Sequence, residues 1–261
     1  MHRAYNLKVA GSNPASATKL QKQLMKNVVY KRHIDNFSNH WWFQARKKII
    51  EEIIKKNFNK KIDILDFGSG SGVNIKMLSQ FGFVNIYEPH SDTKKYLKIK
   101  YKNKNKFKIL NKIKNQKFDL IILADVLEHL KNDKKELKRL NKNLKKNGHI
   151  LITVPAYEFL FSMKDKTLGH FRRYNKQQIT KLFKKFNIIK LTYFNFFLFI
   201  PISLIIMFFK ILNINFIKKV ENSPNLIINK ILFFIFVIEG KIIKILNLPL
   251  GISLLGLFKK K

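Results

Sequence analysis

An acid followed by alternating glycines is the feature of this sequence that most directly suggests chemistry. Asp66 ends an apolar run, and Gly68, Gly70 and Gly72 follow it at every second position, with the hydroxyl of Ser69 between the first two. Glycine allows a tight turn and lets a ligand approach the backbone closely. We therefore predict a buried strand that ends in a ligand-binding loop.

A second acid, Glu88, stands about 20 residues beyond the first glycine, at the end of another short apolar run. Between the two runs we expect a helix over residues 74–81, closed by Gly82 in the left-handed conformation. In strand–loop–helix–strand units of this spacing, a carboxylate can reach the ribose hydroxyls of a bound nucleotide. A dinucleotide fingerprint would need glycine where the sequence has Val73 or Ile75, which disfavours a nicotinamide oxidoreductase.

The pattern Asp-x-Gly-x-Gly-x-Gly resembles the cofactor loop of class I S-adenosylmethionine-dependent methyltransferases. The runs 118–125 and 126–130 look like the fourth strand and following loop of the same superfamily. The resemblance implies that the loop passes under the amino-acid part of S-adenosylmethionine and that the acid after the second strand holds the ribose. The cofactor residues that it implies are Asp66, Gly68, Ser69, Gly70, Gly72, Glu88 and Asp125.

The resemblance also implies an α/β fold, a Rossmann-like, doubly wound and mostly parallel sheet of seven strands with the last strand antiparallel. Strands alternating with helices along the chain favour such a sheet, with ligands at the carboxyl ends of its strands. Beyond the first strand, we expect strands at 83–87, 107–110, 118–125, 149–154, 188–194 and 248–258, and helices at 132–144 and 175–186. Asn147-Gly148 should turn the chain into the fifth strand.

Two further segments resemble a bacterial branch of small methyltransferases often found among genes for surface polysaccharide and lipid assembly. They are residues 40–46, which contain Trp41 and Trp42, and residues 163–174. The two tryptophans either close over the cofactor or pack against the sheet. The branch does not fix the acceptor, which could be a small molecule, a glycan or a lipid.

The second of these segments holds the candidate acceptor residues. A base is needed only if the acceptor atom is protonated at neutral pH, and His170 and His129 are the candidates because histidine titrates near that pH. His129 could instead pack beside the cofactor. The groups that could grip a phosphate or carboxylate on the acceptor are Asp165, Arg172, Arg173 and Tyr174. The two arginines could equally be surface or helix-capping charges.

Composition limits the alternatives. The chain has 52 lysines and arginines against 16 acids, a net charge of +36, and no cysteine. Much of the lysine excess fits a genome rich in A and T, although lysine-rich faces are also attracted to anionic membranes. Base-amino methyltransferases usually carry Asn/Asp-Pro-Pro-aromatic after the fourth strand, where this chain reads Asp125-Val126-Leu127-Glu128, so nucleic acid is disfavoured. Thiolate metal sites are impossible, and we assign no metal ligands.

Residues 196–248 contain two apolar stretches, 196–209 and 226–238, between the sixth and last strands. Because both ends return to one sheet, the segment crosses a membrane an even number of times or not at all. We expect helices lying in the cytoplasmic leaflet, with a buried helical cap and a two-span hairpin as alternatives. Deletion of 196–248 should then leave a soluble domain.

The chain therefore divides into a methyltransferase domain over 25–195, a membrane-associating insertion over 196–248 and a last strand over 249–261. We expect residues 1–24 either to be a disordered leader or to precede a true start at Met25. The expected function is methyl transfer from S-adenosylmethionine to a small-molecule, glycan or lipid-linked acceptor on the cytoplasmic side of a membrane. The alternatives are an RNA methyltransferase and a non-catalytic nucleotide-binding protein.

Overall fold

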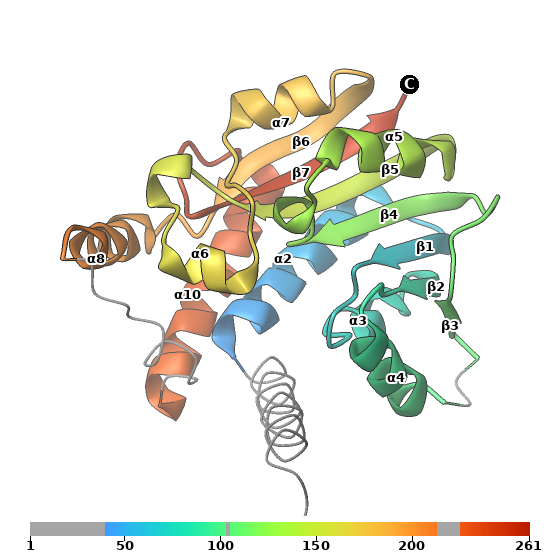
Figure 1. Cartoon of the computed structure of the whole chain (residues 1–261), viewed down its shortest axis with the longest axis horizontal. Coiled ribbons are helices and arrows are strands. Elements are labelled where there is room, and N and C mark those ends of the chain that lie inside the picture. Colours follow the sequence, from blue (N-terminus) through green and yellow to red (C-terminus); the bar gives the residue numbers. More distant parts are fainter. Residues whose placement is uncertain (1–39, 103–104, 213–224) are drawn as a thin grey trace, which may run out of the picture.

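The structure is a computed structural model that describes residues 40–102, 105–212 and 225–261 (Figure 1). The expectations for residues 1–24, and for the middle of the insertion at 213–224, lie outside the described residues.

Seven strands form one sheet in the order β3-β2-β1-β4-β5-β7-β6 (Figure 1). Neighbouring strands pair in parallel, except that β7 is antiparallel to both β5 and β6. This confirms the expected α/β fold with its antiparallel last strand. The strands are β1 Ile62–Phe67, β2 Gly82–Tyr87, β3 Phe107–Leu110, β4 Phe118–Ala124, β5 Leu144–Pro155, β6 Phe186–Phe194 and β7 Ser253–Lys260.

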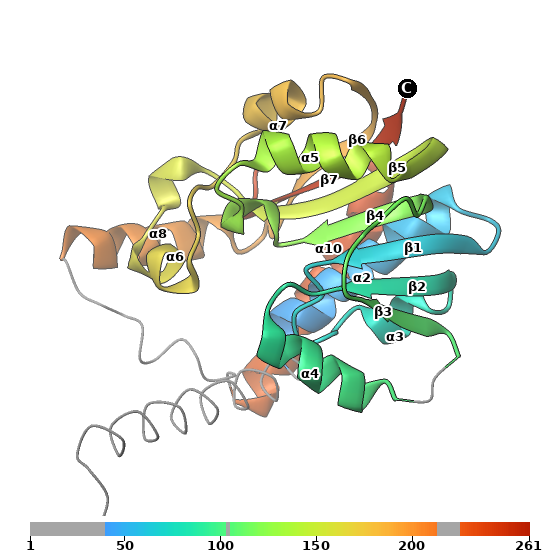
Figure 2. The same ribbon diagram turned by 45° about the vertical axis from the view of Figure 1, so that its right-hand side comes forward.

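Helices cover both faces of this sheet (Figures 1 and 2). Alternate residues of β1 point to opposite faces, so that Ile64 joins a core with α2, α3, α4 and α10, whereas Leu65 joins a core with α5 and α7. The helices are α2 Trp41–Asn57, α3 Ile75–Leu78, α4 Ser91–Lys100, α5 Asp133–Lys142, α6 Met163–Leu168, α7 Lys176–Leu182, α8 Phe199–Ile211 and α10 Leu226–Ile245, with short 3-10 turns at Leu127–His129 and Glu158–Leu160.

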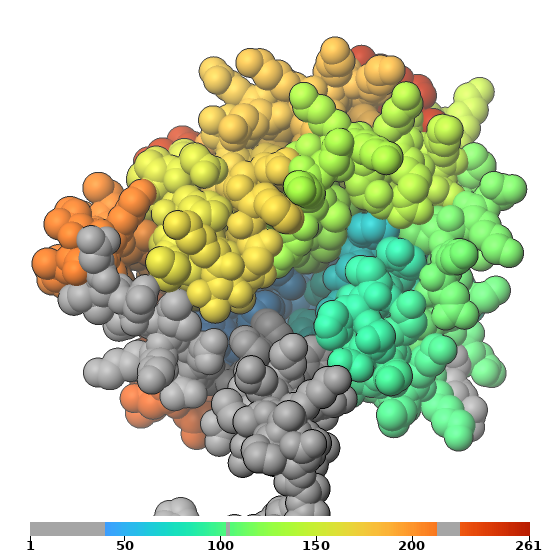
Figure 3. All heavy atoms as spheres, viewed as in Figure 1, coloured from blue at the N-terminus to red at the C-terminus, as the bar shows by residue number. Residues whose placement is uncertain are grey.

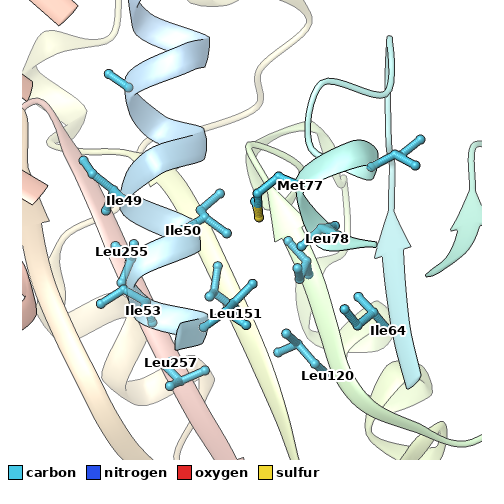
Figure 4. Packing of buried hydrophobic residues seen from close by; sticks show 14 of the residues in the cluster. Ile49, Ile50, Ile53, Ile64, Met77, Leu78, Leu120, Leu151, Leu255 and Leu257 are labelled. Atoms are coloured by element: carbon cyan, nitrogen blue, oxygen red, sulfur yellow. The ribbon is translucent and has the colours of Figure 1, made fainter. Parts of the chain in front are cut away.

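Helix α2 lies against the centre of the sheet. Its buried isoleucines, among them Ile50 and Ile53, lie beside Leu151 of β5 and Leu255 of β7 (Figure 4). Helix α10 packs closely on the outside of α2, because a Cβ at Gly240 would lie only 3.2 Å from Cγ1 of Ile49. This packing fixes α2 and therefore the side chains that α2 extends toward the site.

Gly82 corrects one sequence-based expectation. The helix expected over 74–81 is limited to α3, and Gly82 does not cap it in the left-handed conformation, because the described glycines with positive φ are 68, 70, 72 and 169. Gly82 instead begins β2, where a Cβ would lie 1.9 Å from the carbonyl oxygen of Ile62. Glycine is needed there because two strand backbones approach closely.

Two strand boundaries also differ from expectation. β5 begins at Leu144, and the turn predicted at Asn147-Gly148 lies inside it, where the pairing with β4 shifts register and Asn147 takes a φ of 60°. Asparagine tolerates that conformation, so the strand continues through a bulge. β7 begins at Ser253, later than the expected 248.

Helices α8 and α10 lie between β6 and β7 in the chain. No helix among the described residues combines the length and apolarity needed to cross a membrane. The second half of α10 is part of the core, since Phe236 and Ile243 are fully buried with the residues of α2. Deleting 196–248 would uncover that core, so the expectation of a soluble domain after this deletion is not supported.

Candidate active site

The glycine loop follows β1 at the carboxyl edge of the sheet. Gly68, Gly70 and Gly72 have φ values of +72°, +53° and +77°, which L side chains rarely adopt. The Oγ of Ser69 donates a hydrogen bond of 2.9 Å to the carbonyl oxygen of Asp66 and holds the turn. A Cβ built on Gly70 meets no described atom within 4 Å, so the loop presents a bare backbone to open space.

Glu88 ties this loop to the end of β2. The buried carboxylate accepts hydrogen bonds from the backbone N–H of Gly70 at 2.8 Å and of His90 at 2.9 Å, one on each oxygen. The sequence correctly placed Glu88 beside the glycine loop. Its contact with a ribose stays a prediction.

Asp66 lies beneath the loop as a buried acid that is only partly compensated. Asp66 is 2% exposed, and its Oδ2 has no hydrogen-bond partner among the described residues. Burial, with a smaller contribution from the negative charge of Glu88, raises the pKa of Asp66 to about 6. A ligand that donates a hydrogen bond to this oxygen would offset the cost of burying it.

Arg46 is a site residue that the sequence reasoning missed. Arg46 is buried and extends from α2 to form an ion pair with Oδ2 of Asp125, a partly exposed acid at the end of β4. Asp125 has a φ of 56° and accepts a second hydrogen bond of 2.7 Å from the hydroxyl of Thr153. The Nε of Arg46 has no partner among the described residues. The available signal was an arginine, rare in this lysine-rich chain, within the segment 40–46.

Trp41 and Trp42 pack inside the protein. Trp41 makes an edge contact with Phe236 at 5.2 Å between ring centroids, and Trp42 stacks on Phe194 at 5.7 Å. Of the two interpretations offered by the sequence, these contacts favour packing against the sheet and α10 over closure on a cofactor.

On the acceptor side, one buried acid organises the loop after β5. Asp165 accepts hydrogen bonds from Nε and Nη2 of Arg173, both at 2.9 Å, and its Oδ1 lies 2.9 Å from Nδ1 of His170. Burial alone would raise the pKa of Asp165, but the hydrogen bonds from His170 and Arg173 outweigh it and lower that pKa. Asp165 is therefore ionised, and His170 donates from Nδ1.

The remaining predicted acceptor residues tie this loop to the start of α5. The hydroxyl of Tyr174 donates to Oδ2 of Asp133 at 2.9 Å and also lies 3.1 Å from the carbonyl oxygen of Leu127. Arg172 donates to Asp133 at 3.0 Å and to the carbonyl oxygen of Lys131 at 3.0 Å. Their observed role is to hold the loop, and a direct grip on an acceptor stays a prediction.

The same loop brings the two candidate histidines together. The ring centroids of His129 and His170 are 4.6 Å apart with the planes at 83°. Burial, and then the neighbouring His170, lower the pKa of His129. The backbone N–H of Phe171 donates to the carbonyl oxygen of Glu128 at 2.8 Å and fixes the loop against the end of β4. His129 is also close enough to Asp125, at the end of β4, for the negative charge of that acid to oppose the lowering of its pKa.

Figure 3 shows a hollow on this face of the molecule, between the yellow segment that contains α6 and the cyan-green segment that contains α3 and α4. Residues 163–174 belong to the first of these segments, and Glu88 lies in the chain between α3 and α4 of the second.

This sheet order, with a glycine loop after β1 and an acid after β2, is that of S-adenosylmethionine-dependent methyltransferases. The chain belongs to the methyltransferase-domain family, whose model matches residues 38–190. S-adenosylmethionine is the cofactor, and the open side of Gly70 and the unpaired oxygen of Asp66 fit a ligand at this loop.

The chain is similar to two curated proteins from Rickettsia. The ubiquinone biosynthesis O-methyltransferase of Rickettsia prowazekii (strain Madrid E) is 28% identical over 171 residues, 54% of this chain and 68% of that protein. The protein of the same name from Rickettsia typhi (strain ATCC VR-144 / Wilmington) is 26% identical over 168 residues, 53% of this chain and 67% of that protein.

Solved structures share the fold. The N-methyltransferase NodS from Bradyrhizobium japonicum WM9, in complex with S-adenosyl-L-homocysteine, gives a TM-score of 0.55 at 11% identity, covering 89% of this chain and 96% of that chain. Coclaurine N-methyltransferase, bound to N-methylheliamine and S-adenosyl-L-homocysteine, gives 0.51 at 12% identity, covering 82% and 72%.

Proposed function

We propose that this protein transfers a methyl group from S-adenosylmethionine to a hydroxyl oxygen of an apolar small-molecule or lipid-linked acceptor at an anionic membrane surface. Oxygen as the methylated atom is supported by the names of the two Rickettsia relatives. The observation that carries the proposal is the His129–His170 pair, which adjoins the cofactor side of the sheet at Asp125.

The chemistry is an in-line displacement. The acceptor oxygen forms a bond to the methyl carbon while the carbon–sulfur bond breaks, and the electron pair of that bond stays on sulfur to give S-adenosylhomocysteine. Much of the rate comes from holding the two reactants in line. The glycine loop, Asp66 and Glu88 hold the cofactor, and the hydroxyl proton leaves at the histidine pair, which Asp165 orients from behind.

An apolar acceptor and a membrane partner are supported by the surface of α8, which projects at one end of the molecule (Figure 1). Neither α8 nor the stretch 226–238 of α10 contains an acid, whereas both contain an exposed lysine, Lys210 and Lys230. Such faces suit an anionic lipid surface. The exposed apolar side chains include Ile200, Leu204, Ile205, Phe208 and Ile211 in α8, and Leu226, Ile227, Ile231 and Phe234 in α10.

Helix α8 also adjoins the acceptor loop. The Nζ of Lys210 donates to the carbonyl oxygen of Phe159 at 3.2 Å, and the rings of Phe199 and Tyr157 lie 5.5 Å apart. Phe159 is itself exposed, as is Met163 at the start of α6. The apolar surface therefore continues toward the loop that carries His170, which would let an apolar acceptor reach the site from a bilayer.

The test is transfer of labelled methyl from S-adenosylmethionine into separated lipid, glycan, small-molecule and RNA fractions. We expect label in the apolar fraction, base-stable as an ether. His170→Ala should lower transfer by roughly 10²–10⁴-fold with cofactor affinity nearly unchanged. His149→Ala, which removes a histidine of β5, is the matched control and should retain activity. Label confined to RNA would favour the nucleic-acid alternative, and cofactor binding without any transfer would favour a non-catalytic protein.

A further inference from the structure

Glu128 is a buried acid that the described part of the chain compensates only in part. Burial, with the negative charge of Asp125, raises the pKa of its carboxyl well above the ordinary range, and the positive charge of Arg46 offsets this only partly. Glu128 is 0% exposed, and neither carboxylate oxygen has a hydrogen-bond partner among the described residues. Burying a carboxylate without a hydrogen bond or a counter-charge is strongly unfavourable. Protonation relieves this cost, and a bound cation would relieve it while keeping the carboxylate ionised.

The nearby arginines are engaged elsewhere. Arg46 forms its ion pair with Asp125, and Arg173 forms its ion pair with Asp165. Each of these acids therefore has a cation, whereas Glu128 has no ion pair among the described residues. A cation for Glu128 would therefore have to come from outside these ion pairs, and the two histidines are the nearby groups that could bind it together with Glu128.

The geometry of this group suits a cation. One ligand atom each from Glu128, His129 and His170 can be chosen so that all lie within 4.8 Å of one another. Nδ1 of His170 donates to Asp165, so Nε2 carries the lone pair and points away from that acid. A carboxylate behind a histidine is the usual support of a metal-ligating imidazole, because it fixes the tautomer and ring orientation.

We propose that Glu128, His129 and His170 bind one divalent transition-metal ion, with Asp165 supporting His170 from behind. Two imidazoles and one carboxylate are a donor set for zinc, iron, manganese or cobalt, and three protein ligands leave positions open for another oxygen. The site was not predicted from the sequence, because His170 is distant along the chain from the other two ligands.

The ion would deepen the proposed function by activating the acceptor. An ion held by these residues would make a hydroxyl oxygen at an open position easier to ionise, with its proton released to water. The oxygen would then bond to the methyl carbon as the carbon–sulfur bond breaks and its electron pair stays on sulfur. In this form of the mechanism His170 binds the ion and does not act as the general base. No general base is then needed, because the ion makes the hydroxyl easier to ionise. This consequence rests on the proposed function, whereas metal binding itself does not.

The binding test uses tag-free, full-length protein freed of metal with a chelator and titrated with Co²⁺ and Zn²⁺. Calorimetry measures affinity and stoichiometry, and the visible absorption of Co²⁺ reports its ligands. We expect one ion per chain, with affinity at least tenfold lower in Glu128→Gln, His129→Ala and His170→Ala. The matched controls Glu136→Gln, on α5, and His149→Ala, on β5, should bind like the wild type.

The outcomes separate this inference from the proposed function. Wild-type protein that binds neither ion, or a folded Glu128→Gln protein that binds both as tightly as wild type, would overturn the site. Thermal melting and cofactor affinity check folding, and His170→Ala provides the test if Glu128→Gln does not fold. Full methyl transfer by chelated protein would overturn the catalytic role of the ion while leaving the methyltransferase proposal intact. Metal bound at this site without transfer to any acceptor would count against the proposed function alone.

Discussion

The carboxylate of Asp165 and the guanidinium of Arg173 face each other through two contacts of 2.9 Å, Nε to Oδ1 and Nη2 to Oδ2. Both side chains are buried, and Nη1 of Arg173 also lies 3.3 Å from the carbonyl oxygen of Ala156. The paired contacts fix the plane of the carboxylate. Because Oδ1 also accepts from His170, this ion pair sets the orientation of the imidazole that the proposed chemistry uses.

Removing the arginine of this pair should destabilise the protein strongly. Arg173→Met leaves Asp165 buried without its cation, so we expect the free energy of unfolding in urea to fall by about 3–5 kcal/mol. Arg172→Met is the matched control, because its side chain is 32% exposed and should lose only about 1 kcal/mol. Equal losses in both variants would show that burial of the Asp165–Arg173 pair does not dominate the stability of this loop.

The cofactor loop can be tested with two glycines that both have positive φ. Gly70 and Gly169 both have positive φ and open surroundings among the described atoms, but only Gly70 adjoins Glu88. Gly70→Val should abolish measurable S-adenosylmethionine binding in calorimetry because it fills ligand space, whereas Gly169→Val carries similar backbone strain and should keep the affinity. The idea fails if both variants lose affinity equally.

Glu88→Gln tests the acid of the same site. The substitution keeps the shape and removes the charge, so binding of S-adenosylmethionine should weaken by about 1–3 kcal/mol. Glu136→Gln on α5 serves as the control. An unchanged dissociation constant for Glu88→Gln would mean that Glu88 only holds the loop through its bonds to Gly70 and His90.

Asp66 should make stability depend on pH. Its folded-state pKa of about 6 is above the ordinary value of 3.8, so the folded state binds the proton more tightly than the unfolded state. The resulting stabilisation is complete below pH 3.8 and is lost as the pH rises through about 6. Between pH 4 and 7.5, wild type should lose about 2 kcal/mol of unfolding free energy relative to Asp66→Asn. Parallel pH profiles for the two proteins would refute this assignment.

Lipid binding should depend on the exposed face of α8. Leu204 and Phe208 are 62% and 59% exposed. Replacing both by aspartate adds negative charge at the face where we expect anionic lipid. Sedimentation with phosphatidylglycerol vesicles should show at least roughly tenfold weaker binding, because apolar burial and attraction to lysines are both lost. Ile99→Asp, at a residue 78% exposed on α4, should bind like the wild type. Wild-type protein that ignores these vesicles would contradict the membrane proposal.

Local patterns were enough to predict the strands that carry the cofactor loop. Asp66, the glycines and Glu88 lie within one strand–loop–helix–strand unit, and the apolar runs fix which residues are buried. The role of Gly82 was missed because it depends on the distance to Ile62 in a neighbouring strand. The pattern within one segment gives no information on how closely the backbones of two strands approach.

The acceptor side was harder for the same physical reason. One segment of the sequence contains His170, Arg173 and Asp165. The sequence alone could not show that Arg173 and Asp165 form a hydrogen-bonded ion pair. Arg46 and Glu128 acquire their significance only when α2 and the end of β4 meet across the sheet. Local spacing therefore reveals functional groups that stand close together in the sequence. It does not reveal those that depend on pairing between distant residues.

The position of β7 between β5 and β6 also sets an order of events during synthesis. Among the described strands β6 pairs only with β7, and β7 follows α8 and α10 in the chain. Both apolar helices are therefore synthesised before β6 can pair with another strand. Pairings that wait for late segments are slow and leave apolar surface uncovered meanwhile. The nascent protein thus presents the apolar side chains of α8 and α10 while the sheet is still unfinished.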